Sequence, residues 1–155
     1  MKRVSLVTRS ASTPNTSATA CRRAVQISSS VHGFRGLDSE HARQIELLTA
    51  FRHAVAKERP RIEVDEIFDR LIDYTQVHFG AEQELMRLYQ YPSYHQHRED
   101  HANTVDRLQA LRRAYLDGKE ELACSTADDL AEKLLAHMRS ADRALGSFLV
   151  RLGVG

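Results

Sequence analysis

Apolar side chains recur at every third or fourth position through most of the chain, which is the spacing of one face of an α-helix. Four such stripes run through residues 38–56, 62–89, 93–116 and 125–152, and short segments with Pro, Gly or Ser separate them. The pattern therefore predicts an all-α fold, in which four amphipathic helices with short connections form an up-down-up-down four-helix bundle.

Local signals predict where these helices begin and end. Asp38 is a favourable N-cap for the first helix, and Ser125 with Asp128 forms a capping-box pattern that starts the fourth helix after Ser125. Proline disfavours helix in the residue before it, so Tyr91-Pro92 is expected to reverse the chain between the second and third helices. Gly118 is expected to end the third helix.

Polar residues interrupt the apolar stripes at a similar depth in the predicted bundle. His78 and Glu82 lie four residues apart on the second helix, so they stack on one inward face. His97 and His101 do the same on the third helix. Polar groups buried in this way are costly unless they have partners. The outer helices supply the further candidates His41, His137 and Asp142.

This set of imidazoles and carboxylates indicates a metal site in the bundle core. It contains no thiolate, so iron, manganese, zinc and copper are all compatible with it. Seven donors exceed what one octahedral ion can use, whereas two ions that share bridging carboxylates can use all of them. The alternative is a bundle without metal, because a single inward histidine is more often a hydrogen-bonded core residue than a ligand.

Three motifs resemble the signature of the hemerythrin family, and in particular its single-domain bacterial members. They are H-F-x-x-E-x-E-L-M from His78, Y-P-x-x-x-x-H-x-x-x-H from Tyr91 and H-M-x-x-x-D from His137. The first-helix sequence Asp38-Ser39-Glu40-His41 is similar to the D-x-Q-H of the family, with Glu in place of Gln. The resemblance covers roughly Leu37 to Leu152.

The resemblance implies a hemerythrin-like bundle with two iron ions, which binds O2 in storage, delivery or scavenging and has no catalytic cycle of its own. O2 would bind as peroxide at an open position of one iron. The alternatives are an oxygen or redox sensing module, a di-iron oxidase or peroxidase-like protein, and a protein that handles NO or iron. In the implied ligand set, His97, His101 and His137 bind one iron, His41 and His78 bind the other, and Glu82 and Asp142 bridge them together with an oxo or hydroxo group.

By the same analogy, the oxygen site is lined by Gln44, Phe79, Lys133, Leu134 and Met138. Gln44 and Lys133 are polar where the family usually has apolar side chains. Water and protons displace bound oxygen from a wet pocket, so we hypothesise faster autoxidation than in a dedicated carrier. The alternative is that Lys133 extends to solvent and Gln44 turns outward.

The remaining histidines, His32, His53 and His95, match no motif position, and His95 is expected on the surface together with Glu84. The two cysteines, Cys21 and Cys124, fall in a predicted tail and a predicted loop. We expect two unpaired thiols in a reducing compartment, with a disulfide or redox pair as the alternative.

Residues 1–36 lack sustained apolar periodicity, so they are expected to form a disordered extension or a loosely docked arm beside a bundle domain of residues 37–155. A transit peptide is the alternative. Residues 1–37 hold six basic and no acidic residues, so the remainder has 16 basic and 21 acidic residues and a formal charge of −5, which argues against nucleic-acid binding. No stretch approaches the about 20 apolar residues of a membrane span, so a soluble, cytoplasmic protein is expected.

Overall fold

A computed structural model of the chain describes residues 35–154, with side chains from Ser39 onward, so the predictions for residues 1–34 lie outside the described residues. The described part contains helices and no strand. Three rods are single helices, α2 (Arg35–Ala56), α3 (Arg61–Leu88) and α4 (Tyr94–Leu116). The fourth rod joins α5 (Glu120–His137), the π-helical segment η1 (Met138–Asp142) and α6 (Arg143–Arg151). The predicted all-α class is confirmed.

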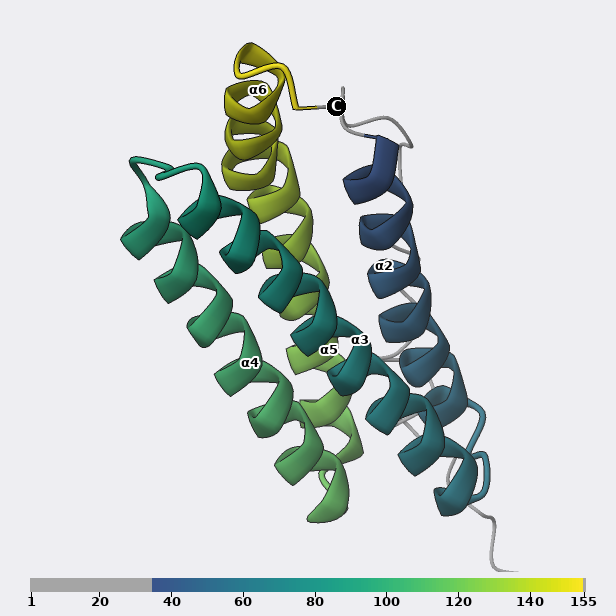
Figure 1. Ribbon diagram of the computed structural model, residues 1–155. Coiled ribbons are helices and arrows are strands. Elements are labelled where there is room, and N and C mark those ends of the chain that lie inside the picture. The colour runs from purple at the N-terminus through teal and green to yellow at the C-terminus, as the bar shows by residue number, and fades with distance from the viewer. Residues whose placement is uncertain (1–34, 155) are drawn as a thin grey trace, which may run out of the picture.

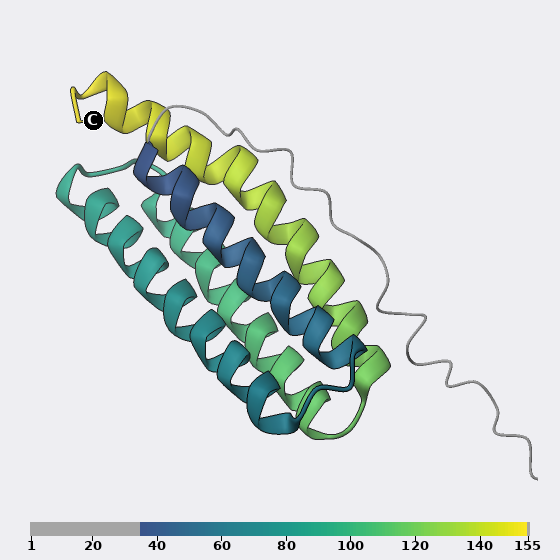
Figure 2. The ribbon, with the colours of Figure 1, turned by 90° about the vertical axis from the view of Figure 1, so that its right-hand side faces the viewer.

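The four rods run alternately up and down and close into a bundle (Figures 1 and 2). Rod α2 contacts α3 and α5, and α4 contacts the same two helices, so each rod has two neighbours. The start of α2 and the end of α6 therefore lie at the same end of the molecule (Figure 1). This arrangement is the predicted up-down-up-down topology, and it turns one stripe of every helix toward a shared axis.

Most predicted helix boundaries agree with the structure to within a few residues. Ser93 directly precedes α4, and Gly118 follows it with a φ of 71°, the left-handed conformation that glycine adopts without a steric penalty. Gln90 also has a positive φ, 51°, in the reversal before Pro92. Helix α2 begins at Arg35, three residues before the predicted N-cap Asp38.

The predicted start of the fourth helix is wrong. Helix α5 begins at Glu120, and Ser125 lies inside it, where its hydroxyl donates a hydrogen bond of 3.1 Å to the carbonyl of Leu122. Two acidic residues, Glu120 and Glu121, occupy the first turn and interact favourably with the positive end of the helix dipole. The capping-box pattern at Ser125 is therefore a coincidence inside a longer helix.

The two expectations for Cys124 are also wrong. Cys124 lies on α5 rather than in a loop, and it is buried together with Ala123 and Ala127 on the inward face of that helix. It is disulfide-bonded, and its partner lies outside the described residues. Disulfides persist in oxidising surroundings, so the argument from the cysteines for a reducing compartment no longer holds.

The core consists of two apolar clusters along the bundle axis. The larger cluster fills the half of the bundle that contains Phe51, Phe68 and Leu111, and all four rods contribute to it. The smaller cluster is built on Met86, Leu145 and Leu149 near the end of α6. Along α3, α5 and η1, the predicted metal ligands fall between residues of the two clusters. The last predicted inward residue, Leu152, is instead 52% exposed, because α6 has already ended.

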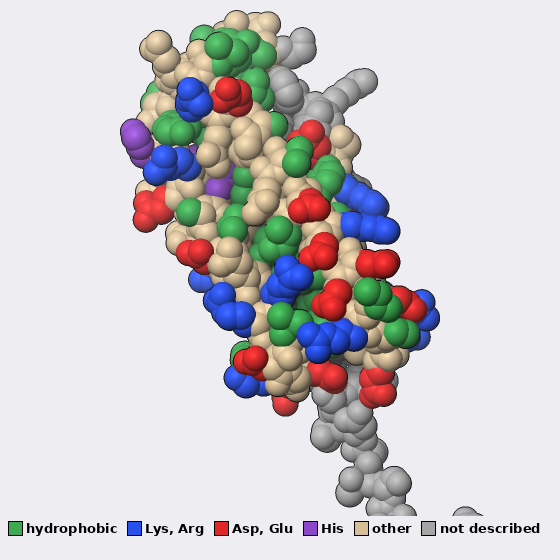
Figure 3. All heavy atoms as spheres, turned by 60° about the horizontal axis from the view of Figure 1, so that its bottom comes forward, with side chains coloured by type: hydrophobic (Ala, Val, Ile, Leu, Met, Phe, Trp, Pro, Cys, Tyr) green, Lys and Arg blue, Asp and Glu red, His purple; other side chains and the backbone are tan. Residues whose placement is uncertain are grey.

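The face of the molecule in Figure 3 carries acidic and basic side chains side by side, without a large patch of either sign. Some exposed charges pair with a neighbour three or four residues away, as Arg59 does with Glu63 at 2.9 Å. Within residues 35–154, no helix combines the length and the apolarity that crossing a bilayer requires. His53, His95 and Glu84, which match no ligand position, are exposed.

Candidate metal centre

All four rods contribute side chains to one polar group in the bundle core. Six of its seven members are at least nine-tenths buried as whole residues, and the His137 side chain is 10% exposed. Helical spacing explains the pairs on α3 and α4, because residues four apart lie on one face. The structure thus brings together every residue that the sequence predicted as a ligand: His41, His78, Glu82, His97, His101, His137 and Asp142.

The donor atoms fall into two groups that have both carboxylates in common. One group contains three histidines and the other contains two, and within each group the donor atoms lie within 4.8 Å of one another. Glu82 and Asp142 belong to both groups. A site for two neighbouring ions that share bridging carboxylates requires this arrangement.

The three-histidine group has the donor spacing of an octahedral coordination shell. The Nε2 atom of His97 lies 3.0 Å from that of His101 and 3.1 Å from that of His137. Glu82 Oε2 is 3.0 Å from His101 Nε2, and Asp142 Oδ1 is 3.0 Å from His137 Nε2. With metal–ligand bonds of about 2.1 Å, neighbouring donors of an octahedral ion lie about 3.0 Å apart. Three nitrogens and two oxygens therefore fit five positions around one ion.

The two-histidine group is looser and has one donor fewer. His41 Nε2 lies 2.9 Å from Asp142 Oδ2 and 3.9 Å from Glu82 Oε1. His78 Nε2 lies 3.7 Å from the same Glu82 oxygen. The two imidazole rings meet edge to face, with their centroids 4.8 Å apart. Two nitrogens and two oxygens leave more of the coordination sphere of an ion free than the five donors of the other group.

Each oxygen of Glu82 faces a different group. Its Oε1 atom is the one near His41 and His78, while its Oε2 atom is near His97 and His101. The residue is fully buried, so neither oxygen is solvated. This division between the two oxygens is the geometry of a carboxylate that bridges two ions.

Asp142 is divided in the same way. Its Oδ2 atom faces His41, and its Oδ1 atom lies 3.0 Å from the Nε2 atoms of both His97 and His137. The side chain is 3% exposed. Two carboxylates on different rods therefore connect the same two groups of histidines.

The π-helical segment η1 explains how Asp142 reaches His137, five residues earlier. In a regular α-helix, residues five apart point about 140° away from each other. Hydrogen bonds from residue i to i+5 widen the turn through Met138–Asp142, and they turn both side chains toward the bundle axis. The five-residue spacing can be read from the sequence. The π-helical widening that brings both side chains to the same site cannot.

Several donor atoms of the two groups are buried and make no hydrogen bond. They are the Nε2 atoms of His41 and His78, both carboxylate oxygens of Glu82 and Oδ1 of Asp142. They lie within a few ångströms of one another. A buried polar group without a partner is costly, and a shared cation satisfies such a set. The residues therefore fit a metal pair.

The pKa values of the two carboxyl groups follow from their surroundings in the metal-free chain. Burial by itself raises the pKa of Glu82, but the nearby imidazoles of His101 and His97 outweigh it and lower this pKa to about 2. Burial likewise raises the pKa of Asp142, and the imidazoles of His137, His41 and His97 lower it further below its usual range. Both groups are therefore anionic at neutral pH, as metal ligands must be.

Two of the histidines shift in opposite directions. Burial lowers the pKa of His97, but the carboxylates of Asp142 and Glu82 outweigh it and raise this pKa to about 9. For His101, burial is the larger effect and lowers the pKa, although Glu82 opposes it. At neutral pH a proton on His97 thus partly balances the two buried carboxylates when no metal is present.

Outer partners orient some of the histidines through their second ring nitrogen. Nδ1 of His78 lies 2.7 Å from a carboxylate oxygen of Glu40. Nδ1 of His101 lies 3.4 Å from the Gln83 amide, and the Nδ1 of His97 is buried without a hydrogen bond. Glu40 was visible in the sequence only as a departure from the D-x-Q-H pattern, because its contact joins two different helices.

Apolar side chains cover one side of the site. The Phe79 ring stacks on His101 with centroids 3.7 Å apart, and it also lies near His78 and His137. Leu134 and Met138 are buried in the same cluster as Phe79. Three of the five residues predicted to line the oxygen site are therefore buried and apolar, and one of them, Phe79, contacts the donor histidines.

The two polar residues predicted for this pocket differ in position. Gln44 does not turn outward: it is fully buried and its amide nitrogen donates a 2.9 Å hydrogen bond to the Thr75 hydroxyl. Its amide oxygen has no partner. Lys133 is exposed and lines an open polar cleft of about 430 Å³ between α4 and α5, where His137 also reaches the surface. An unpaired ammonium group is costly to bury, so Lys133 does not share the buried pocket.

Comparison with known proteins gives a consistent picture. A family model, the hemerythrin HHE cation binding domain, matches residues 32–149. A bacteriohemerythrin of Stenotrophomonas maltophilia is 31% identical over 112 residues, which cover 72% of this chain and 72% of that protein. A bacteriohemerythrin of Ralstonia nicotianae is 30% identical over 130 residues, which cover 83% of this chain and 91% of that protein. No solved structure gives a significant match.

Proposed function

Because the chain belongs to the hemerythrin family, we propose that it is a non-haem di-iron protein that binds O2 reversibly, for storage, delivery or scavenging. The observation that carries this proposal is the pair of donor groups with two carboxylates in common. When iron is bound, it supplies the electrons that O2 binding requires. We assign the protein no catalytic cycle of its own.

The two groups of donors are suited to different roles, because they contain different numbers of protein donors. The three-histidine group, with five protein donors, would leave one position of an octahedral ion, which the oxo or hydroxo bridge would fill. The two-histidine group, with four donors, leaves room for an external ligand beside His41 and His78. Phe79 and its buried neighbours exclude water from one side of the centre, which favours reversible binding over oxidation.

The second candidate function is one-way oxidation at the same centre, in a redox sensor or an oxidase, or in handling of NO or iron. The observation that favours it is the buried Gln44, whose amide oxygen has no partner. Such a group attracts water or a proton donor into an otherwise apolar layer. The two candidates differ in what happens when oxygen is removed: a carrier returns to its original state, whereas a sensor or oxidase stays oxidised.

Loading the protein anaerobically with ferrous iron separates these functions. About two irons per chain should be retained, as in other bundles with carboxylate-bridged metal pairs. Oxygen is then admitted and removed while the visible absorption spectrum is recorded. A band that appears and disappears reversibly supports the carrier, whereas permanent oxidation supports the sensor or oxidase. Failure to retain iron contradicts both.

Substitution of one ligand tests the site itself. His101→Leu should abolish retention of the iron pair, because it removes a nitrogen donor that lies 3.0 Å from both His97 Nε2 and Glu82 Oε2. The fold should survive, since leucine can pack against Phe79. His95→Leu is the matched control on the same helix, because His95 is exposed. Iron content is measured per chain and helical content by circular dichroism; unchanged iron in His101→Leu would remove it from the ligand set.

A further inference from the structure

The carboxylate of Glu40 makes the shortest contact between a predicted ligand and a residue outside the ligand set. Its Oε2 atom lies 2.7 Å from His78 Nδ1, the ring nitrogen that faces away from the other donors. The side chain of His78 is only 1% exposed, whereas that of Glu40 is 42% exposed. An N–H group of the buried imidazole therefore donates to a carboxylate at the edge of the bundle.

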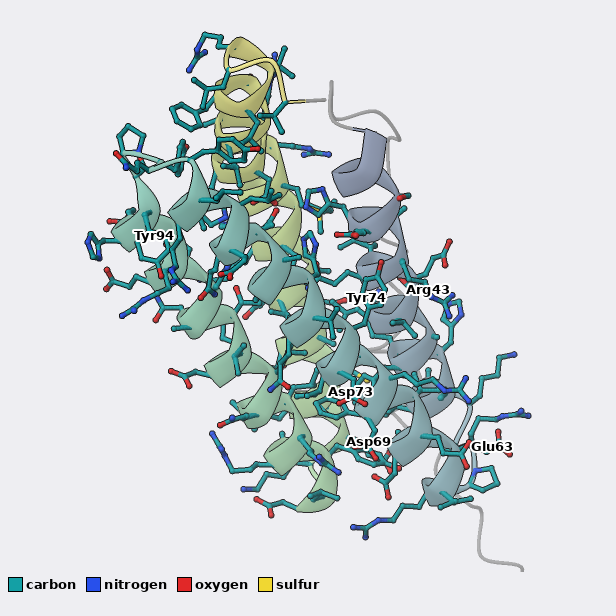
Figure 4. All side chains as sticks on the ribbon, in the orientation of Figure 1. Arg43, Glu63, Asp69, Asp73, Tyr74 and Tyr94 are labelled. Atoms are coloured by element: carbon teal, nitrogen blue, oxygen red, sulfur yellow. The ribbon has the colours of Figure 1, made fainter. Side chains whose placement is uncertain are left out.

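Among the residues whose side chains are described, no cation pairs with Glu40. The nearby Arg43 pairs with Glu46 at 3.1 Å instead, and it lies with Tyr74 at the junction of α2 and α3 (Figure 4). Among the described residues, the only ion-pair partner of the Glu40 carboxylate is His78. A half-exposed glutamate without a defined partner would be free to rotate into water, so the contact with His78 holds it in place.

Among the described residues, the histidines of the three-histidine group have no comparable partner. The Gln83 amide lies 3.4 Å from Nδ1 of His101, and the nearest oxygen of Asp100 lies 3.8 Å from Nδ1 of His137. Nδ1 of His97 makes no hydrogen bond. A close carboxylate thus supports the two-histidine group, while the three-histidine group has only weaker outer contacts.

We propose that Glu40 is a positioning residue that fixes the ring of His78 and strengthens its Nε2 as a metal ligand. A carboxylate that accepts the Nδ1–H of a ligating histidine sets the tautomer in which Nε2 carries the lone pair, and it increases the basicity of the ligand. The group with fewer donors receives this support, which compensates for its smaller donor number. The inference rests on the proposed metal pair and goes beyond it.

Zinc binding tests this role without oxygen chemistry. The metal-free protein and its Glu40→Gln and Glu40→Ala variants are titrated with Zn²⁺ in competition with a chromophoric chelator. Both variants should bind the first equivalent like the wild type and the second about 10–100-fold more weakly, which is the usual effect of losing such a partner. Glu40→Gln keeps an acceptor of the same length without the charge, so its loss should be the smaller of the two.

Two controls separate this role from a structural one. Glu84→Gln removes an exposed carboxylate that pairs with Arg87 rather than with a ligand, and both zinc affinities should stay unchanged. In Glu40→Gln the amide oxygen can still accept the Nδ1–H of His78, so the thermal midpoint of this metal-free variant should stay close to that of the wild type. In the zinc-loaded protein, the Nδ1 proton of His78 should exchange slowly in wild type and rapidly in Glu40→Ala.

The outcomes distinguish this inference from the function on which it rests. If the wild type binds fewer than two zinc ions, the two-metal site itself fails, and with it the inference. If the wild type binds two and the Glu40 variants bind both equally well, the site stands and the role of Glu40 is refuted. Equal weakening of both equivalents, or a lowered midpoint of metal-free Glu40→Gln, would assign Glu40 a structural role and overturn the proposal.

Discussion

Gln44 introduces an amide into the layer of core side chains next to the two-histidine group. It lies one helical turn after His41, and its partner Thr75 lies one turn before His78. Both residues are fully buried, and the amide oxygen makes no hydrogen bond. A polar atom in this state costs about 1–3 kcal/mol, so the residue is better explained by an interaction in the loaded protein than by stability.

Replacing Gln44 with leucine tests its effect on stability and its effect on the oxygen chemistry of the loaded protein. Gln44→Leu removes the unpaired oxygen at similar volume, so the metal-free protein should gain about 1 kcal/mol in its free energy of unfolding. The iron-loaded protein should autoxidise more slowly, because the pocket becomes drier. Unfolding in urea and the decay of the oxygen-dependent absorption band measure the two effects.

Thr75→Val is the opposing control: it leaves the Gln44 amide nitrogen without its acceptor and should lower stability. An unchanged autoxidation rate in Gln44→Leu would separate Gln44 from the oxygen chemistry.

At the scale of single elements, the fourth rod depends on its π-helical segment. The five residues Met138–Asp142 connect α5 to α6. Beyond them, Leu145 and Leu149 of α6 are buried in the core. A π-helical turn inserts one residue into an α-helix, and such turns are frequent at functional sites. Here the extra residue allows His137 and Asp142 to face the same two groups of donors.

Deleting the exposed Ser140 should convert this segment into a regular α-helix. Asp142 would then follow His137 by four residues, so the inward face stays inward and the protein should remain helical. The carboxylate would move by about 1.5 Å along the helix axis, which exceeds the about 0.5 Å that a bridged metal site tolerates. We expect loss of the metal pair, measured as zinc per chain, with unchanged circular dichroism. Two tightly bound ions in the deletion variant would show that the π-helical turn is dispensable.

At the scale of the whole molecule, the site replaces apolar packing in the middle of the bundle. The larger cluster lies on one side of the donors, and the cluster of Met86, Leu145 and Leu149 lies on the other. Apolar surroundings strengthen the interactions among the buried charges and make unpaired charges expensive. Folding and metal binding are therefore coupled, and the stability of the metal-free protein should depend on pH.

The direction of this dependence follows from the shifted pKa values. The pKa of Glu82 is lowered from 4.5 to about 2, so its contribution to stability is complete above pH 4.5 and is lost as the pH falls toward 2. The pKa of His97 is raised from 6.5 to about 9, so its contribution is complete below pH 6.5 and is lost as the pH rises through 9. The pKa of His101 is lowered, so its contribution has the opposite sign: it reduces the stability of the folded protein as the pH falls below 6.5.

Metal loading should change the alkaline side of this profile. A bound ion needs the deprotonated imidazole of His97, so the stabilisation by zinc should grow between pH 6.5 and 9, where the metal-free protein loses stability. At acid pH, protonation of the ligands should release the metal. Urea unfolding midpoints with and without Zn²⁺ measure the difference. A constant difference between pH 6.5 and 9 would contradict the assignment of His97 as a ligand.

The sequence by itself determined the four helices and six of the seven candidate donors from local periodicity, and the H-M-x-x-x-D motif added Asp142. His78 with Glu82 and His97 with His101 could be placed on shared faces from their spacing alone. The start of the fourth helix was mispredicted for a related reason: Ser125 offers a local cap, but the longer apolar face through Ala123 and Cys124 packs in the core, and that packing outweighs a cap.

Only the tertiary structure decided how the donors divide between two groups. The two oxygens of Glu82 face different helices, Asp142 reaches its partners through a π-helical turn, and Glu40 meets His78 across the junction of α2 and α3. These features depend on the rotation and axial position of one rod relative to another. Packing of the whole core fixes those quantities, and no spacing within a single helix encodes them.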